Sequence, residues 1–258
     1  MNMKIEFDVN YDFTNDTPMF WESYWNDEMG GSFVDPDTKS KMLKKYHRIV
    51  WSKKLPNGQE MELKEENNSK YLSWNNFSFG SDSIICSFRY HKYRYMIKEV
   101  MSYLPDYKSF MEDYARKIYT IGGSIIFPKL KGSINQARGC NSYIIDRFDL
   151  TLECIRRYYN QEASVLSSTF NIEQNKQFLD LFVNFKGYVD YFYLQDLVNE
   201  DYTKVKFWLG NGDFIINPFP KSKEEYLEFI NKQLDFVEKR NKRIHDSIIN
   251  STKKDISF

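Results

Sequence analysis

The sequence has few of the features that mark secreted or membrane-spanning proteins. Only three cysteines occur among 258 residues, and Cys86, Cys140 and Cys154 form neither a CxxC pair nor a zinc-type cluster with histidine. No apolar run approaches the roughly 18 residues that a membrane-spanning helix needs, and the mean hydropathy is -0.63. These absences argue against a disulfide framework and predict a reduced, cytoplasmic protein without a membrane span.

The sequence also lacks net charge and nucleotide-binding fingerprints. Lys and Arg number 36, as do Asp and Glu, so no overall basic field attracts nucleic acid and any such binding needs a local patch. No phosphate-loop or dinucleotide motif is present. Glycine is scarce while Asn, Lys, Ile, Tyr and Phe abound, which indicates an AT-rich genome such as that of a low-GC bacterium or its phage.

Apolar residues are plentiful enough for one large core, since 41% of the chain is hydrophobic and 17% aromatic. We expect a single globular domain over residues 1–250 and a flexible tail over residues 251–258. Strands and helices do not alternate regularly, which favours an α+β fold with an N-terminal antiparallel sheet packed by several helices. The predicted strands are Lys4–Phe13, Glu60–Leu63, Lys70–Trp74 and Ser83–Phe88, and a helix is predicted from Asp37 or Thr38 to Trp51.

A long C-terminal helix has a clear start signal. Ser222 and Glu225 have the spacing of a capping box, and apolar residues then recur every three or four positions as far as Ile248. Asn241 lies within that apolar stripe, where we expect it to hydrogen-bond a backbone group as a buried amide must.

The segment from Ser133 to Gln161 carries the densest group of charges beside a strong helical pattern. Apolar residues at helical spacing predict a helix from Ile144 to Tyr159. Its other face holds three carboxylates and two guanidinium groups, which are Asp146, Asp149, Glu153, Arg156 and Arg157.

This charged face has two interpretations. Glu153 is spaced to pair with Arg156 and Arg157, so the face is explained by surface ion pairs of small energy. However, Asp149 and Glu153 are a like-charge pair four residues apart, which a site for a divalent cation such as Mg²⁺, or for acid–base catalysis, would explain. The second interpretation makes Asp146, Asp149 and Glu153 the candidate catalytic or metal-binding residues, and Arg156 and Arg157 candidate ligand-binding residues.

A glycine-flanked segment, GSINQARG at residues 132–139, precedes that helix. It holds Asn135, Gln136 and Arg138, whose donors suit an anion at a helix start, with Arg138 on a phosphate group. A purely structural turn explains the segment equally well. Further upstream, FRYHKYRYMIK at residues 88–98 interleaves basic and aromatic residues, as single-stranded nucleic-acid grooves do, although such a run also suits the start of a core helix.

Four blocks of the sequence resemble an uncharacterised bacterial family of unknown function. They are YHRIVWSKKLPNG (46–58), INQARG (134–139), DRFDLTLECIRRYY (146–159) and FVEKRNKRI (236–244). The resemblance covers about residues 7 to 244 and implies one domain in bacteria and mobile elements, without an activity or a site to transfer. Residues 19–32 depart from the shorter, proline-rich start of that family, so nothing is carried onto them.

A second, local resemblance concerns Arg240 to His245. The string RNKRIH is similar to the R-N-x-x-x-H motif of HEPN ribonucleases, in which the Arg and His of paired helices cleave RNA without a metal ion. The resemblance implies catalysis by Arg240 and His245, whereas the predicted strands depart from an all-helical HEPN fold. We expect this segment to be packing and solvated charge.

These patterns favour a protein that binds or processes a phosphate-bearing ligand, either a nucleotide or RNA. Two alternatives stay open, a non-enzymatic module that binds a protein partner, as in phage–host conflict, and a HEPN-like ribonuclease. The sequence fixes neither the ligand nor the oligomeric state, and it leaves open whether the protein is an enzyme.

Overall fold

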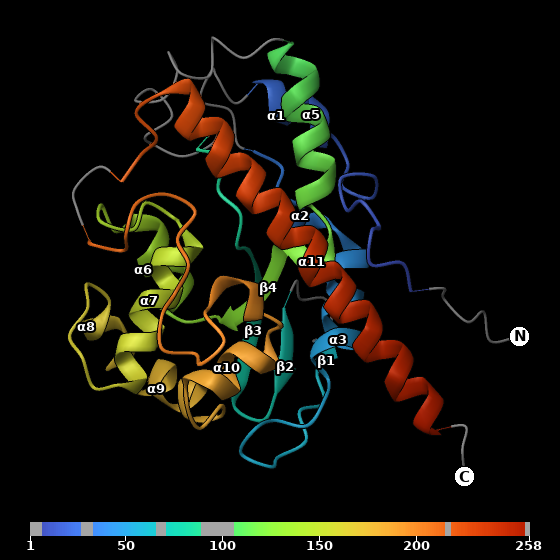
Figure 1. The fold of residues 1–258 in the computed structure, drawn as a ribbon. Coiled ribbons are helices and arrows are strands. Elements are labelled where there is room, and N and C mark those ends of the chain that lie inside the picture. The colour runs from blue at the N-terminus through green and yellow to red at the C-terminus, as the bar shows by residue number, and fades with distance from the viewer. Residues whose placement is uncertain (1–6, 27–32, 66–70, 89–105, 215–217, 256–258) are drawn as a thin grey trace, which may run out of the picture.

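An antiparallel sheet with the strand order β1-β2-β3-β4 forms the centre of the molecule. The computed structural model describes residues 7–26, 33–65, 71–88, 106–214 and 218–255 (Figure 1). Helices cover the sheet within one domain, which confirms the predicted α+β class. The strands are β1 (Lys64–Glu65), β2 (Leu72–Trp74), β3 (Phe77–Ser83) and β4 (Ser124–Pro128).

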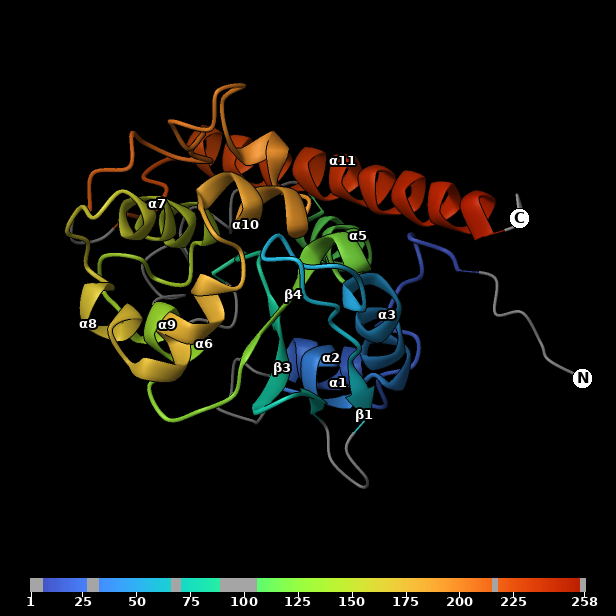
Figure 2. The same ribbon diagram turned by 90° about the horizontal axis from the view of Figure 1, so that it is seen from below.

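The pairing of β3 with β4 is the longest in the sheet and runs from Phe79 opposite Pro128 to Ser83 opposite Ser124. Every residue of β4 is buried, because helices lie on both sides of it. In Figure 2 the N-terminal helices lie on one side of β3 and β4, and helices of the central region lie on the other. A carboxylate at the end of β3 is therefore enclosed by elements from distant parts of the chain.

Shorter helices are distributed along the rest of the described chain. They are α1 (Phe20–Asn26), α2 (Pro36–Lys39), α3 (Lys41–Trp51), α5 (Tyr107–Ile118), α6 (Ile134–Cys140), α7 (Phe148–Tyr159), α8 (Ser167–Phe170), α9 (Glu173–Asp180) and α10 (Phe185–Tyr191), with 3-10 turns η2 (Ile121–Gly123) and η3 (Gln195–Leu197). Among the described residues, no helix combines the length and apolar character that crossing a membrane requires.

The long helix α11 (Lys223–Asp255) crosses the molecule beside α5 and η2, as Figure 1 shows. Its start confirms the predicted cap by Ser222, whose Oγ accepts from Glu225 N at 3.2 Å, while Glu225 Oε2 accepts from Lys221 N at 2.6 Å, one residue before the N-cap. The helix includes residues 251–255 of the predicted tail. The flexibility of that tail stays a prediction.

Four predicted elements differ from the observed ones near the N-terminus. Glu60–Leu63 is not a strand, because only Glu60 forms an isolated bridge, with Lys54, and the first strand begins at Lys64. The described part of the Lys4–Phe13 strand consists of turns and extended chain, and its alternating aromatics pack on α3 instead, with Phe7 stacked on Tyr46 at 4.5 Å. The predicted helix ending at Trp51 is divided at Ser40, which has extended backbone and caps α3 by accepting from Leu43 N at 2.9 Å. The chain of Ser83–Phe88 leaves the sheet after Ser83 because β4 ends its pairing there.

Candidate functional site

Two carboxylates enter the candidate site from the start of α2. Asp35 is the N-cap of this helix, and its side chain accepts from Asp37 N at 3.0 Å. Pro36 occupies the first helical position, where the missing N–H removes no helical hydrogen bond. The helix stops after one turn because Ser40 is extended. This short turn places Asp35 and Asp37, two residues apart, beside β3.

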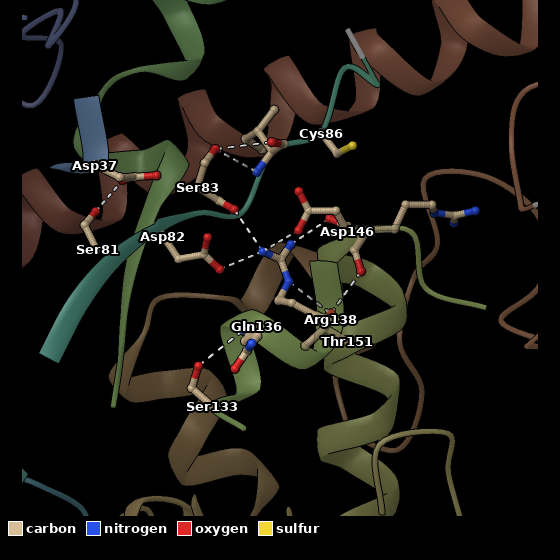
Figure 3. A network of polar contacts seen from close by, with 12 residues as sticks. Asp37, Ser81, Asp82, Ser83, Cys86, Ser133, Gln136, Arg138, Asp146 and Thr151 are labelled. Carbon is tan, nitrogen blue, oxygen red and sulfur yellow. Dashed lines mark hydrogen bonds and ion pairs between the residues drawn. The ribbon is translucent and has the colours of Figure 1, made fainter. Parts of the chain in front are cut away.

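A third carboxylate comes from the end of β3. Asp82 lies opposite Ile125 of β4, so its backbone is fixed by the longest strand pairing of the sheet. Its side chain is 14% exposed and forms an ion pair with Arg138, whose Nη1 lies 2.7 Å from Oδ2. The flanking Ser81 and Ser83 contact Asp37 and Arg138 respectively, which ties α2 and α6 to the same strand end (Figure 3).

Arg138 of α6 is fully buried between these elements. Its Nη1 contacts Asp82 at 2.7 Å and Asp146 at 2.9 Å. Its Nη2 donates to the carbonyl of Asp146 at 2.7 Å, and its Nε donates to Thr151 Oγ1 at 3.3 Å (Figure 3). All three guanidinium nitrogens are thus engaged inside the protein, and the predicted contact of Arg138 with a phosphate finds no geometric support.

The fourth carboxylate, Asp146, lies on a strained link between α6 and α7. Ile145 and Asp146 have φ values of 46° and 67°, in the left-handed region that a β-branched residue such as Ile145 strongly disfavours. Such strain persists only where the surroundings over-determine the conformation, and it concentrates at functional sites. Here Arg138 holds both the carbonyl and the carboxylate of Asp146.

That link also corrects the predicted helix from Ile144 to Tyr159. The helix begins at Phe148, with Arg147 in extended backbone before it. Asp146 therefore precedes the helix and does not share a face with Asp149 and Glu153.

The four aspartates line one cavity of about 170 Å³. No Lys, Arg or His is among the described residues that line it, and Arg138, behind the cavity, forms ion pairs with Asp82 and Asp146. Aromatic rings of Tyr24, Phe33, Phe88 and Tyr119 line the same cavity, together with Ser83, Ile85, Cys86, Ser87 and Ile118. The cavity thus combines acidic and aromatic surface.

The four carboxylates are half-buried, and their crowding around one cavity favours their neutral forms. Burial, together with the neighbouring Asp82, raises the pKa of Asp35 to about 6. Burial and then the charges of Asp35 and Asp82 raise the pKa of Asp37 well above its ordinary value. Burial also raises the pKa of Asp82 to about 6, although the guanidinium of Arg138 opposes the shift. Carboxyl groups that titrate near neutral pH are suited to donate and accept protons in catalysis.

A pH-dependent stability follows from the raised pKa of Asp35. The folded state holds this proton more tightly than the unfolded state, whose carboxyl titrates near 3.8, so the stabilisation is present below about pH 4 and is lost as the pH rises through about 6. Asn at this position keeps the N-cap and cannot ionise. We expect Asp35→Asn to match the wild type near pH 4 and to have a free energy of unfolding about 3 kcal/mol larger than that of the wild type at pH 7. Urea unfolding at both pH values measures the difference, and an equal stability at pH 7 would contradict the raised pKa.

Asp149, predicted as a catalytic or metal-binding residue, forms a buried ion pair away from this cavity. Its carboxylate accepts from Arg147 Nε at 3.1 Å and Nη2 at 2.5 Å, and from the backbone N–H of Trp208 at 2.9 Å. The side chain is fully buried. Asp149 therefore ties α7 to the segment around Trp208.

Glu153 also has its own partners. It accepts from Arg156 Nε at 2.8 Å and from Arg157 Nε at 2.8 Å, while Arg156 also binds Glu162. This is the ion-pair arrangement that helical spacing predicts. The catalytic, metal and ligand roles of Asp149, Glu153, Arg156 and Arg157 stay predictions, and the structure does not bring these residues to Asp146.

The segment 132–139 is the start of a helix. Ser133 Oγ accepts from Gln136 N at 3.3 Å, and Gln136 Oε1 accepts from Gly132 N at 3.0 Å, which is a reciprocal cap. Gln136 is exposed and Asn135 is half-buried, and neither lines the acidic cavity. Their predicted ligand-binding role is untested, and the cap explains the local sequence. The basic run from Arg89 to Lys98 lies outside the described residues.

No three His, Cys, Asp or Glu side chains in the described ranges converge closely enough to enclose a metal ion. A Mg²⁺ ion commonly keeps several waters and takes only one or two protein carboxylates, with phosphate oxygens completing its shell. The divalent cation predicted at Asp146, Asp149 and Glu153 stays a prediction.

Arg240 and His245 of α11 lie in different surroundings. Arg240 is fully buried and donates to the carbonyls of Phe192, Gly122 and Ser124 at 2.8 to 2.9 Å. His245 is exposed beside Asp246. Asn241 Oδ1 accepts from Gly122 N at 2.7 Å, which confirms its predicted backbone bond. The RNKRIH segment packs α11 on its own domain, and the similarity to HEPN ribonucleases finds no support.

Sequence reasoning missed Asp35, Asp37 and Asp82. Asp35 and Asp37 have the pattern of a helix start, and Asp82 has that of a strand end, so each has a local explanation. The only signal was the repetition of aspartates at element ends, in DPD and SDS, with several aromatic residues nearby.

Comparison with protein families matches residues 7–244 to a family of unknown function, DUF6994. The chain belongs to this family, as its sequence blocks predict. Comparisons with curated proteins and with solved structures found no match.

Proposed function

We propose that this member of the DUF6994 family is an enzyme that uses the aspartates of the acidic cavity as general acid and base on a small polar substrate. The observation that carries the proposal is that Asp35, Asp37, Asp82 and Asp146 line one cavity, while among the described residues Arg138 alone forms ion pairs with two of them. Carboxyl groups with pKa values near 6 supply both an acid and a base at neutral pH.

The sign of the charge selects the class of reaction. Transition states of acyl and phosphoryl transfer gain negative charge and need aligned donors or cations, whereas a carboxylate cavity repels that charge. Cleavage of a glycosidic bond passes through an oxocarbenium-like state with positive charge, which carboxylates stabilise while one carboxylic acid protonates the leaving group. The proposed reaction is therefore hydrolysis or transfer at a glycosidic bond.

The size of the cavity limits the group that enters it. A cavity of about 150 Å³ holds one benzene ring, and this cavity has about 170 Å³. One ring of a glycoside or nucleoside fits, with hydroxyls on the carboxylates and an apolar face on Phe33 or Tyr119. A nucleoside or nucleotide thus remains within the proposed substrate class.

Hydrolysis of chromogenic glycosides, nucleosides and nucleotides tests this proposal. We expect one class to be hydrolysed, and we expect Asp37→Asn to lower the rate by about 10² to 10⁴, the usual share of a general acid or base. Asp235→Asn is the matched control, because Asp235 is exposed and pairs only with Lys239 at 2.6 Å in the described structure. Equal rates in Asp37→Asn and in the control would remove the acid–base role.

A second candidate function is binding of a divalent cation, such as Mg²⁺ carrying a phosphate-bearing ligand. It is favoured by the mutual repulsion of Asp35, Asp37 and Asp82, which a cation would relieve. A ligand at 100 times its dissociation constant stabilises the fold by about 2.7 kcal/mol, so a thermal shift with Mg²⁺ and nucleotides detects it. Stabilisation without hydrolysis would favour this candidate, and the absence of both would favour a protein-interaction module.

A further inference from the structure

A chain of hydrogen bonds leads from the core to Asp37. Trp51 Nε1 donates to His47 Nδ1 at 2.8 Å, His47 Nε2 is 2.8 Å from Ser81 Oγ, and Ser81 Oγ donates to Asp37 Oδ1 at 2.5 Å. Trp51 and His47 belong to α3, Ser81 to β3 and Asp37 to α2. These hydrogen bonds therefore join three elements to the carboxylate of Asp37 in the cavity.

The first donor fixes the direction of every bond that follows. An indole N–H only donates, so His47 Nδ1 is the acceptor and the ring proton of the neutral imidazole lies on Nε2. Nε2 then donates to Ser81 Oγ, and the single hydroxyl hydrogen of Ser81 is left for Asp37 Oδ1. All three bonds thus point toward the carboxylate.

The imidazole stays neutral where it lies. His47 is 1% exposed, and burial together with the charge of Arg240 lowers its pKa to about 3. Arg240 packs over the Trp51 ring, 5.5 Å from its centroid, and Lys53 lies over the same ring at 5.3 Å. Burial and the charge of Arg240 oppose a second proton on His47, so the direction of the hydrogen bonds does not reverse near neutral pH.

We propose that Trp51, His47 and Ser81 are positioning residues that keep Asp37 Oδ1 as a hydrogen-bond acceptor and leave Oδ2 as the oxygen that exchanges a proton with the ligand. This assignment rests on the proposed acid–base function, because that function requires Asp37 to exchange a proton with the ligand. It differs from simple packing because it predicts which nitrogen of His47 and which oxygen of Asp37 carry protons.

Nuclear magnetic resonance of the full-length protein tests the hydrogen bonds from Trp51 to Asp37, here called the relay, without a substrate. A negative result for the relay is therefore distinct from a negative result for the enzymatic proposal. In the wild type we expect the ring nitrogens of His47 to report the Nε2–H tautomer between pH 5 and 8. Ser81→Ala removes the donor to Asp37, so the carboxyl of Asp37 should titrate at a higher pH, and Ser81→Thr, which keeps the hydroxyl, should restore the wild-type titration.

Trp51→Phe tests the first donor of the relay, because it removes the indole N–H and keeps an aromatic ring. We expect His47 to lose its fixed tautomer and Asp37 to titrate at a higher pH, although Trp51 does not contact Asp37 directly in the described bonds. An Nδ1–H tautomer in the wild type would overturn the relay. So would an unchanged titration of Asp37 in folded Ser81→Ala.

Discussion

Replacing Arg138 by alanine is expected to lower the free energy of unfolding at pH 7.5 by about 3 to 5 kcal/mol, the usual cost of removing one partner from a buried ion pair. Arg138 is the only cation that contacts Asp82 and Asp146 in the described structure, and it also holds the strained carbonyl of Asp146. Its loss leaves both carboxylates without the cation that pairs with them, and the Asp82 side chain is only 14% exposed. Urea unfolding with an unchanged m-value measures the effect.

The pH dependence of this loss separates charge from packing. Without Arg138 the raised pKa values of Asp82 and Asp146 should rise further, so acid restores stability by protonating them. We expect the deficit of Arg138→Ala to be smaller at pH 5 than at pH 7.5. Lys239→Ala is the control, because its pair with Asp235 is exposed to solvent and adds little to stability. An equal deficit at both pH values would show that packing, and not charge, is lost.

Asp149→Asn is expected to cost a similar amount, about 3 to 5 kcal/mol, because it leaves the buried guanidinium of Arg147 without its counter-charge. The carboxylate also accepts the N–H of Trp208. The amide of Asn has only one acceptor oxygen, so it cannot replace both carboxylate oxygens toward Arg147 and Trp208. A residue whose role is to bind a ligand would instead tolerate this change or gain stability from it. Thermal and urea unfolding at pH 7 measure the loss.

Glu153→Gln gives the matched comparison for Asp149→Asn. Glu153 is 8% exposed but its partners Arg156 and Arg157 are 14% and 29% exposed, so water compensates part of the lost charge. We expect a loss of about 1 kcal/mol. Equal losses in both variants would contradict the division of the predicted charged face into a buried pair and a surface network.

Local signals predicted the elements that local interactions form. Ser222 and Glu225 lie within one helical turn, so the start of α11 follows from the sequence alone. The start of α7 does not, because the apolar pattern extends to Ile144 while the left-handed conformations of Ile145 and Asp146 are imposed by Arg138. Tertiary contacts overrode the helical pattern there.

The candidate site was predictable only in part for the same reason. Arg138 and Asp146 were singled out for their charge, and they do meet. Their partner Asp82 lies 56 residues from Arg138 along the chain, and only the pairing of β3 with β4 brings it there. Asp35 joins them as a helix cap, a role that the sequence pattern explains without any site.

The most direct test of the acidic cavity as the functional site is a pH titration of ¹³C-labelled aspartate carboxyls, assigned with the single Asn variants. The structure predicts that Asp35, Asp37 and Asp82 titrate well above the ordinary range, with Asp35 and Asp82 near pH 6 and Asp37 well above its usual value. Binding of a cationic ligand or of a divalent ion should lower these values. Titration of all of them near pH 4 would show that the cavity is open to water, and would contradict the proposed acid–base site.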